Sequence, residues 1–201
     1  PAGLFCAYWL AEHGNHRVLV LDKGQGPRQR KCPIAGRRGG ECVRCQPCNI
    51  LSGVGGAGLF SDGKLNFIHI LGKTDLTQFL PAPEAMALIE ETESVFTRFG
   101  MDGPVYPTDM ELARDIRRNA RRHGLDLLLI RQKPLGSDHL PGLITGMADY
   151  IGERGVTFRT GEEVTGVVVK DGKARGVTTV KGGYQAPAVV LAPGRVGAEW
   201  M

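Results

Sequence analysis

Apolar residues three or four positions apart open the chain, and an unbroken apolar run follows them. The spacing over residues 1–14 predicts a helix with one apolar face, and Gly14 is expected to end it as a left-handed C-terminal cap. The run RVLVLD at 17–22 predicts a short, buried, parallel strand that ends on Asp22. A helix, a tight turn and such a strand are typical of the second half of a dinucleotide-binding βαβ unit.

The middle of the chain has mainly helical spacing. A helix is expected over 84–99, and a second begins at a capping box formed by Thr108 and Glu111 and ends at Gly124. The compact apolar run LDLLLI at 125–130 predicts a strand, and a further helix is expected to end at Gly155. The five arginines of the second helix indicate a solvated basic face, because no aromatic residues or binding motif accompany them.

Short strand patterns fill the last 50 residues. They predict a small β-meander with an Asp171–Gly172 turn between two of its strands. The unalternating run at 189–192 suits a strand covered on both faces, which would return the chain to a parallel sheet. The alternative is an all-β appendage. Taken together, the elements predict an α/β fold.

Composition limits the class of protein. The 201 residues are 42% hydrophobic and 23% charged, as in a soluble globular domain, and the net charge of +4 would suit a phosphate-bearing ligand as readily as nucleic acid. No secretory or membrane-spanning pattern occurs, so the expected location is cytoplasmic. The 29 glycines gather at segment ends, which indicates loops that approach a ligand closely.

The first residues hold the end of a glycine fingerprint. Pro1-Ala2-Gly3 matches the last residues of a G-x-G-x-x-G motif. Because the chain does not begin with methionine, we infer an N-terminal truncation. Gly3 would be the third glycine, which lets the helix pack close to the sheet. Asp22, nineteen residues later, could accept hydrogen bonds from both hydroxyls of an adenosine ribose. The alternative is a plain helix–strand pair with a surface aspartate.

Four of the five cysteines lie between positions 32 and 48, in a basic segment without hydrophobic period. The spacing C-x9-C-x2-C-x2-C lets three thiolates converge from one turn while a fourth returns from a distance. An iron–sulfur cluster, structural zinc, a metal-free redox site and inert thiols all remain open. The candidate metal ligands are Cys32, Cys42, Cys45 and Cys48.

A glycine-rich stretch follows the cysteines. Gly55 and Gly56 permit positive φ and remove side chains where a flat ring or a pyrophosphate must approach. Successive backbone N–H groups there could form an anion nest, to which Lys64 adds a cation and Ser61 a hydroxyl. The alternative is an ordinary glycine turn that leads into a strand.

Three strings carry a family resemblance. PAGLFCAYWLAEHG with VLVLDKG, then GGAGLFSDGKLN, then VVLAPGRVGAEW resemble the largely uncharacterised bacterial and archaeal FAD-dependent dehydrogenases, over nearly the whole chain. The resemblance implies an FAD-binding Rossmann-like domain of the glutathione-reductase type, with a β-meander and a helical insertion, incomplete at both ends. The cofactor-binding residues that it implies are Gly3, Asp22, Lys23, Gly55, Gly56, Ser61, Asp62, Lys64, Val164 and Gly194.

The resemblance also suggests a division of the chain. Residues 1–74 would form the first part of the FAD-binding domain, with the cysteine excursion at 32–48. Residues 75–150 would form the helical, substrate-side insertion, and 151–201 the meander and the return to the sheet. Further flavin contacts and much of the substrate pocket are expected beyond Met201, so no catalytic residue is assigned.

The resulting hypothesis is an enzyme, a flavin-dependent oxidoreductase. It would transfer hydride or electrons between FAD and an unknown small-molecule substrate, with an unknown electron acceptor or donor as partner. We expect no membrane partner and no nucleic acid. One alternative is a cysteine–metal module with a degenerate nucleotide fold, acting as a structural or RNA-associated protein. Another is a flavin-dependent reductase of unsaturated lipids.

Overall fold

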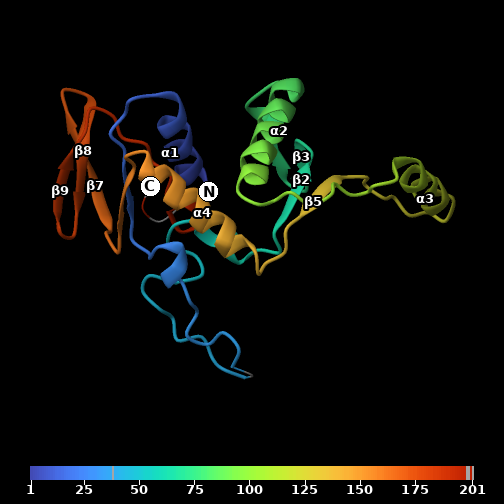
Figure 1. Cartoon of the computed structure of the whole chain (residues 1–201), viewed down its shortest axis with the longest axis horizontal. Coiled ribbons are helices and arrows are strands. Elements are labelled where there is room, and N and C mark those ends of the chain that lie inside the picture. The colour runs from blue at the N-terminus through green and yellow to red at the C-terminus, as the bar shows by residue number, and fades with distance from the viewer. Residues whose placement is uncertain (38, 198–199, 201) are drawn as a thin grey trace. The chain divides into compact units, whose positions relative to one another are not determined.

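A computed structural model describes residues 1–37, 39–197 and 200 of the chain (Figure 1). The chain forms two compact units. The first unit consists of Pro1–Phe60 with Ile144–Met201, and the second unit consists of Ser61–Leu143. Each unit is a mixture of helices and short strands, so the α/β class expected from the sequence is confirmed.

The first unit is built on a parallel strand pair. β1 (Leu19–Asp22) lies beside β6 (Thr157–Thr160), with Asp22 opposite Thr160 at their carboxyl ends. The predicted first helix is α1 (Ala2–His13), but its expected glycine cap is wrong. Gly14 has φ −164° and ψ 162°, because the chain leaves the helix in an extended conformation that leads into β1.

Two helices supply the apolar core of the first unit. α1 buries Leu4, Ala7 and Tyr8, and α4 (Leu140–Glu153), which belongs to this unit from Ile144 on, buries Met147 and Ile151 completely. The two helices are also tied by polar groups, since the Tyr150 hydroxyl donates to Glu12 at 2.6 Å. The ring of Tyr8 lies 6.2 Å from that of Tyr150. Aromatic contact and hydrogen bond together fix α4 against α1.

The expected β-meander is present as a three-stranded antiparallel sheet (Figure 1). Its strands are β7 (Val164–Lys170), β8 (Lys173–Thr179) and β9 (Gly182–Gln185). Asp171 and Gly172 have φ 52° and 70°, which is the two-residue turn that the sequence predicted.

The expected return strand at 189–192 is wrong. No strand forms there in the described chain, and Val190 and Leu191 remain 64% and 50% exposed. Pro187 and Pro193 flank the run and remove a backbone donor at each end of it. The parallel sheet of the described residues therefore consists of β1 and β6.

The second unit is built around an antiparallel strand pair. β2 (Lys64–Phe67) pairs with β5 (Arg131–Pro134), and a short hairpin, β3 (Ile70–Leu71) with β4 (Thr74–Asp75), follows β2. The helix expected at 84–99 is α2 (Ala82–Arg98). Four short 3-10 helices complete the described elements of the two units: η1 (Pro27–Gln29), η2 (Gly56–Phe60), η3 (Leu76–Gln78) and η4 (Gly194–Gly197).

The strand expected at 125–130 is wrong, because the strand that forms lies further along the sequence. The hydrogen-bonded strand is β5, which begins at the next residue, and Leu125 and Leu128 are 61% and 64% exposed. Lys133 of β5 lies in the interior instead, with its ammonium 3.2 Å from Glu93 and 2.9 Å from the Thr97 hydroxyl on α2. The buried side chain of this strand is therefore a charge with two polar partners, and the exposed leucines precede it.

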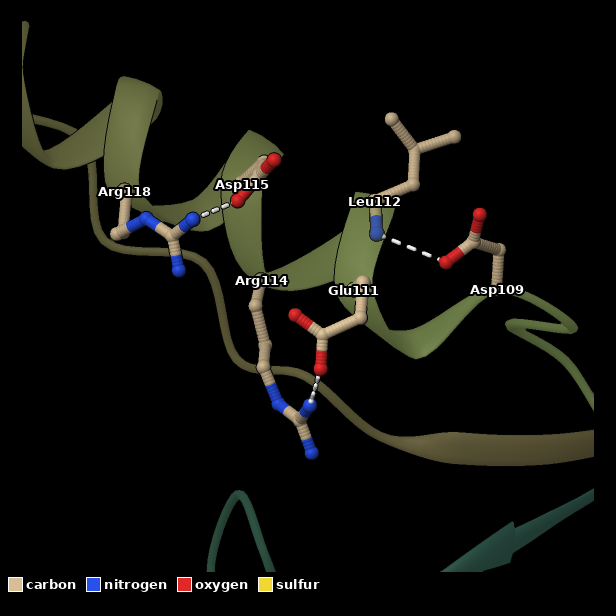
Figure 2. Close-up of polar contacts among 6 residues, drawn as sticks. All are labelled: Asp109, Glu111, Leu112, Arg114, Asp115 and Arg118. Atoms are coloured by element: carbon tan, nitrogen blue, oxygen red, sulfur yellow. Dashed lines mark hydrogen bonds and ion pairs between the residues drawn. The ribbon is translucent and has the colours of Figure 1, made fainter.

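α3 (Met110–Arg122) begins at a different cap from the one expected. The Asp109 side chain accepts a hydrogen bond from the Leu112 amide at 2.9 Å, so the predicted pair of Thr108 with Glu111 is wrong (Figure 2). Glu111 pairs with Arg114 instead. Asp115 likewise pairs with Arg118, so acidic residues one turn earlier partly neutralise the basic face.

No helix in the described part of the chain is long and apolar enough to cross a membrane.

Candidate functional site

The carboxyl ends of β1 and β6 lie at one edge of the parallel pair, which is where open α/β sheets bind ligands. At this edge the backbone oxygen of Asp22 accepts from the Glu162 amide at 3.0 Å, and the Asp22 carboxylate accepts from the Gly24 amide at 2.8 Å. Lys23 forms an exposed ion pair with Glu163, with the charged atoms 3.6 Å apart. Asp22 and Lys23 thus lie at the carboxyl edge of the parallel pair, and their cofactor contacts stay a prediction.

The glycine loop, which we define as residues 53–58, packs directly on the end of β1. A Cβ atom on Gly24 would lie 2.3 Å from the Gly53 nitrogen, so the two backbones touch with no room for a side chain. The Val54 amide donates to the Gln25 oxygen at 3.1 Å. Gly55 and Gly56 have φ 90° and 59°, a region that glycine adopts without strain. These contacts bring the glycine loop to the strand edge that holds Asp22.

The start of α1 adjoins the same loop. A Cβ atom on Gly56 would lie 3.0 Å from the Cδ of Pro1, and one on Gly3 would lie 3.4 Å from the Cβ of Ala192. The predicted residues Gly3, Asp22, Gly55 and Gly56 therefore belong to one region of the first unit, although up to 53 positions separate them in the sequence.

Arg30 holds the glycine loop together, and its role was missed at the sequence level. Its side chain is buried and its guanidinium donates to five backbone oxygens, with the following distances: Asn49 (3.0 Å), Ile50 (2.7 Å), Gly53 (3.4 Å), Val54 (2.9 Å) and Gly56 (2.8 Å). Burial lowers the pKa of Arg30, and the charge of Asp22 opposes that shift. In the sequence, Arg30 is one of several basic residues in an aperiodic segment, and nothing there distinguishes it.

Ser61, Asp62 and Lys64 lie in the second unit, whereas Gly55 and Gly56 lie in the first. The Lys64 ammonium lies 3.0 Å from the Asp62 carboxylate, and its hydrogen bond lowers the pKa of that carboxyl. The Ser61 hydroxyl accepts from the Gly63 amide at 3.2 Å. The cation and the hydroxyl proposed for an anion therefore have local partners within their own turn.

Val164 and Gly194 have contrasting surroundings. The Val164 oxygen accepts a hydrogen bond from the Trp200 indole at 2.8 Å, so this carbonyl is already engaged. Gly194 has φ 68°, and a Cβ atom placed on it would have no heavy atom within 4 Å. The space beside its Cα is therefore open, and its predicted contact with a cofactor stays a prediction.

The four clustered cysteines line a single cavity of about 360 Å³, together with neighbouring residues of 33–50. Cys42 is exposed and the other three are partly buried, all as free thiols. Across 1–37, 39–197 and 200, however, no group of three or more His, Cys, Asp or Glu side chains is arranged to hold a metal ion. The thiols thus share one cavity without forming a ligand set, and the predicted metal centre gains no support from this arrangement.

No family model matches the chain, and no curated protein sequence matches it significantly. Among solved structures, the chain is similar to L-amino acid deaminase from Proteus vulgaris, with a TM-score of 0.54 and 14% identity over 99% of this chain and 46% of that one. The chain shares that fold. It spans less than half the length of the deaminase.

Two further structures are more distant. NikD, an unusual amino acid oxidase essential for nikkomycin biosynthesis, gives a TM-score of 0.45 at 19% identity, over 96% of this chain and 49% of that one. L-Amino acid deaminase from Proteus myxofaciens, in complex with anthranilate, gives 0.40 at 19% identity, over 98% and 44%. Only the first likeness is close enough to show a shared fold.

Proposed function

We propose that this chain provides the FAD-binding part of a flavin-dependent oxidoreductase that acts on a small-molecule substrate. The observation that carries the proposal is the meeting of Asp22, the glycine loop and the start of α1 at the carboxyl edge of the parallel strands. The fold shared with an L-amino acid deaminase supports an oxidoreductase. Because one fold hosts many substrates, it does not select an amino acid as the substrate here.

The residues at this edge fit the parts of FAD in chemical type. The Asp22 carboxylate would accept hydrogen bonds from the adenosine ribose. The backbone N–H of Gly55 would bind the pyrophosphate, while Gly56, whose own N–H donates to the Gly53 oxygen at 2.8 Å, would let the cofactor approach without a side chain in the way. Gly194, whose Cβ position is open, would let backbone approach the cofactor.

Bound FAD would supply the redox chemistry by accepting hydride or electrons from the substrate. The described residues would bind and orient it. Lys23, paired with Glu163 beside the strand edge, would add positive charge near the nucleotide, and Lys64 would do so only after leaving Asp62.

The proposal is tested by purifying the chain, recording its visible spectrum with and without added FAD, and identifying any flavin released on denaturation. We expect a flavin spectrum, and competition of FAD binding by ADP, which shares the adenosine and pyrophosphate groups. Asp22→Asn should weaken FAD binding about tenfold, the effect of losing one charged hydrogen bond. Asp149→Asn, at an exposed ion pair with Arg28 in the same unit, is the matched control and should not. A colourless protein that takes up no flavin would refute the proposal.

We propose the cavity lined by four cysteines as a second site, for a soft metal or for thiol redox chemistry. The common cavity supports it, and rearrangement of the turn at 42–48 would be needed for the thiols to converge on one ion. Iron with a broad absorption near the flavin bands would indicate electron transfer, and zinc would indicate a structural role. A protein that contains metal and no flavin would favour the cysteine–metal module instead.

Elemental analysis decides this second proposal when it is combined with a thiol count. The wild-type chain, purified without oxygen, should contain iron or zinc, and the Cys45→Ser variant should lack that metal. Alternatively, the wild-type thiols should form a reversible disulfide under mild oxidation. Cys6→Ser, in α1, is the matched control. Four freely titrating thiols, with neither metal nor a reversible disulfide, would show that these cysteines are inert.

A further inference from the structure

We propose that Arg30 is the positioning residue of the glycine loop, fixing the direction in which the loop presents its amides and tying it to the wall of the cysteine cavity. The inference rests on the proposed function for its ligand, but its geometry comes from the described residues alone. The Arg30 guanidinium donates hydrogen bonds to five backbone oxygens, and the exposed fraction of the residue is 4%.

Carbonyl groups that face the guanidinium decide where the amides point. In a planar trans peptide, the C=O of one residue and the N–H of the next lie on opposite sides. The Val54 and Gly56 oxygens accept from Arg30 at 2.9 and 2.8 Å. The N–H groups of Gly55 and Ala57, which belong to the same two peptide units, are therefore turned away from Arg30. Two donors directed to one side of a glycine turn are what an anion such as a pyrophosphate requires.

The same guanidinium reaches the cysteine segment. Its Nε donates to the Asn49 oxygen at 3.0 Å and its Nη2 to the Ile50 oxygen at 2.7 Å, and both residues line the cysteine cavity. The Asn49 amide in turn donates to the Lys31 oxygen at 2.9 Å. One side chain thus joins the cavity wall to the glycine loop, so a rearrangement of the cysteines would be transmitted to the loop.

The positive charge of Arg30 matters as well as its hydrogen bonds. All its hydrogen-bond partners are carbonyl oxygens, and no described carboxylate forms an ion pair with it. Its ring contact, with the guanidinium carbon 5.1 Å from the centre of Phe60, is also uncharged. Its hydrogen-bonding partners are thus all dipoles, and the charge of Asp22 acts on it without forming an ion pair, so this buried cation favours an anion near the two turned amides of the same loop.

Hydrogen exchange of residues 53–60, measured by mass spectrometry without flavin, tests the positioning role directly. Arg30→Met and Arg30→Lys should both exchange about tenfold faster or more there, because a lysine cannot bond five oxygens at once. Arg28→Met, which loses only an exposed ion pair to Asp149, is the control and should match the wild type. Unchanged exchange in Arg30→Met, or full protection in Arg30→Lys, would overturn the proposal.

A measurement on the wild type covers the case in which neither variant folds. The Nε–H of Arg30 should exchange with water more slowly, by NMR, than that of Arg28, and equal rates would overturn the proposal. Flavin titration of folded variants then tests the link to the cofactor, with about tenfold weaker FAD binding expected for Arg30→Lys. Faster exchange with unchanged FAD affinity would overturn that link. A wild type that binds no flavin would defeat the proposed function, while the exchange data would still decide what Arg30 does.

Discussion

Gly24→Ala should destabilise the first unit strongly, although alanine is a small and ordinary residue. The added methyl would lie 2.3 Å from the Gly53 nitrogen, 2.4 Å from the Ser52 carbonyl carbon and 2.6 Å from the Gly53 Cα. All three are backbone atoms, held in place by the Arg30 hydrogen bonds, so they cannot rotate aside. A methyl normally stays about 3.4 Å or more from such atoms, and overpacking of this kind costs about 1–3 kcal/mol. We expect a value near the top of that range, about 3 kcal/mol.

Urea unfolding followed by tryptophan fluorescence measures this effect, since both tryptophans, Trp9 and Trp200, belong to the first unit. With a denaturant slope of about 2 kcal/mol per molar, the midpoint should fall by about 1.5 M. Gly152→Ala is the matched control, because a Cβ there meets no atom within 4 Å and the position lies in α4. It should stabilise the unit by about 0.5 kcal/mol. Equal midpoints for wild type and Gly24→Ala would refute the close packing of loop on strand.

Three further predictions concern single polar groups. Asp109→Ala should lower the helicity of α3 in circular dichroism and cost about 1 kcal/mol of stability, whereas Thr108→Ala should change neither; the reverse result would restore the cap expected from the sequence. Glu93→Ala leaves the buried ammonium of Lys133 with one hydrogen-bond partner, Thr97, and should lower the free energy of unfolding by about 2 kcal/mol in thermal unfolding. An unchanged stability would show that the pair is solvated. A threonine hydrogen bond lowers the pKa of Glu162 below its ordinary 4.5, so this carboxylate stabilises the fold above pH 4.5 and the stabilisation is lost as the pH falls through the lowered pKa. In Glu162→Gln the free energy of unfolding, measured by urea unfolding at several pH values, should therefore depend less steeply on pH in that acid range. An unchanged pH dependence would contradict this role of Glu162.

The local elements follow from the sequence where one residue dictates one conformation. The Asp171–Gly172 turn forms as expected because both residues tolerate positive φ, and α2 ends before Gly100, whose φ is 107°. The order of helix, strand and meander likewise follows from apolar spacing, which depends only on neighbouring residues. The strands at 125–130 and 189–192 were wrong, because a strand also needs a partner with free backbone groups, and composition does not show whether one is present.

The candidate site divides in the same way. Residue identity alone shows that thiols, a glycine turn and an aspartate at the end of a strand occur in a chain with α/β spacing. The folded chain was needed to show that Gly24 touches Gly53, that Lys64 pairs with Asp62, and that the four cysteines share a cavity without forming a ligand set among the described residues. Arg30 shows the reason most clearly. Its five hydrogen bonds go to backbone oxygens, which every residue carries, so no pattern of side chains in the sequence could point to its partners.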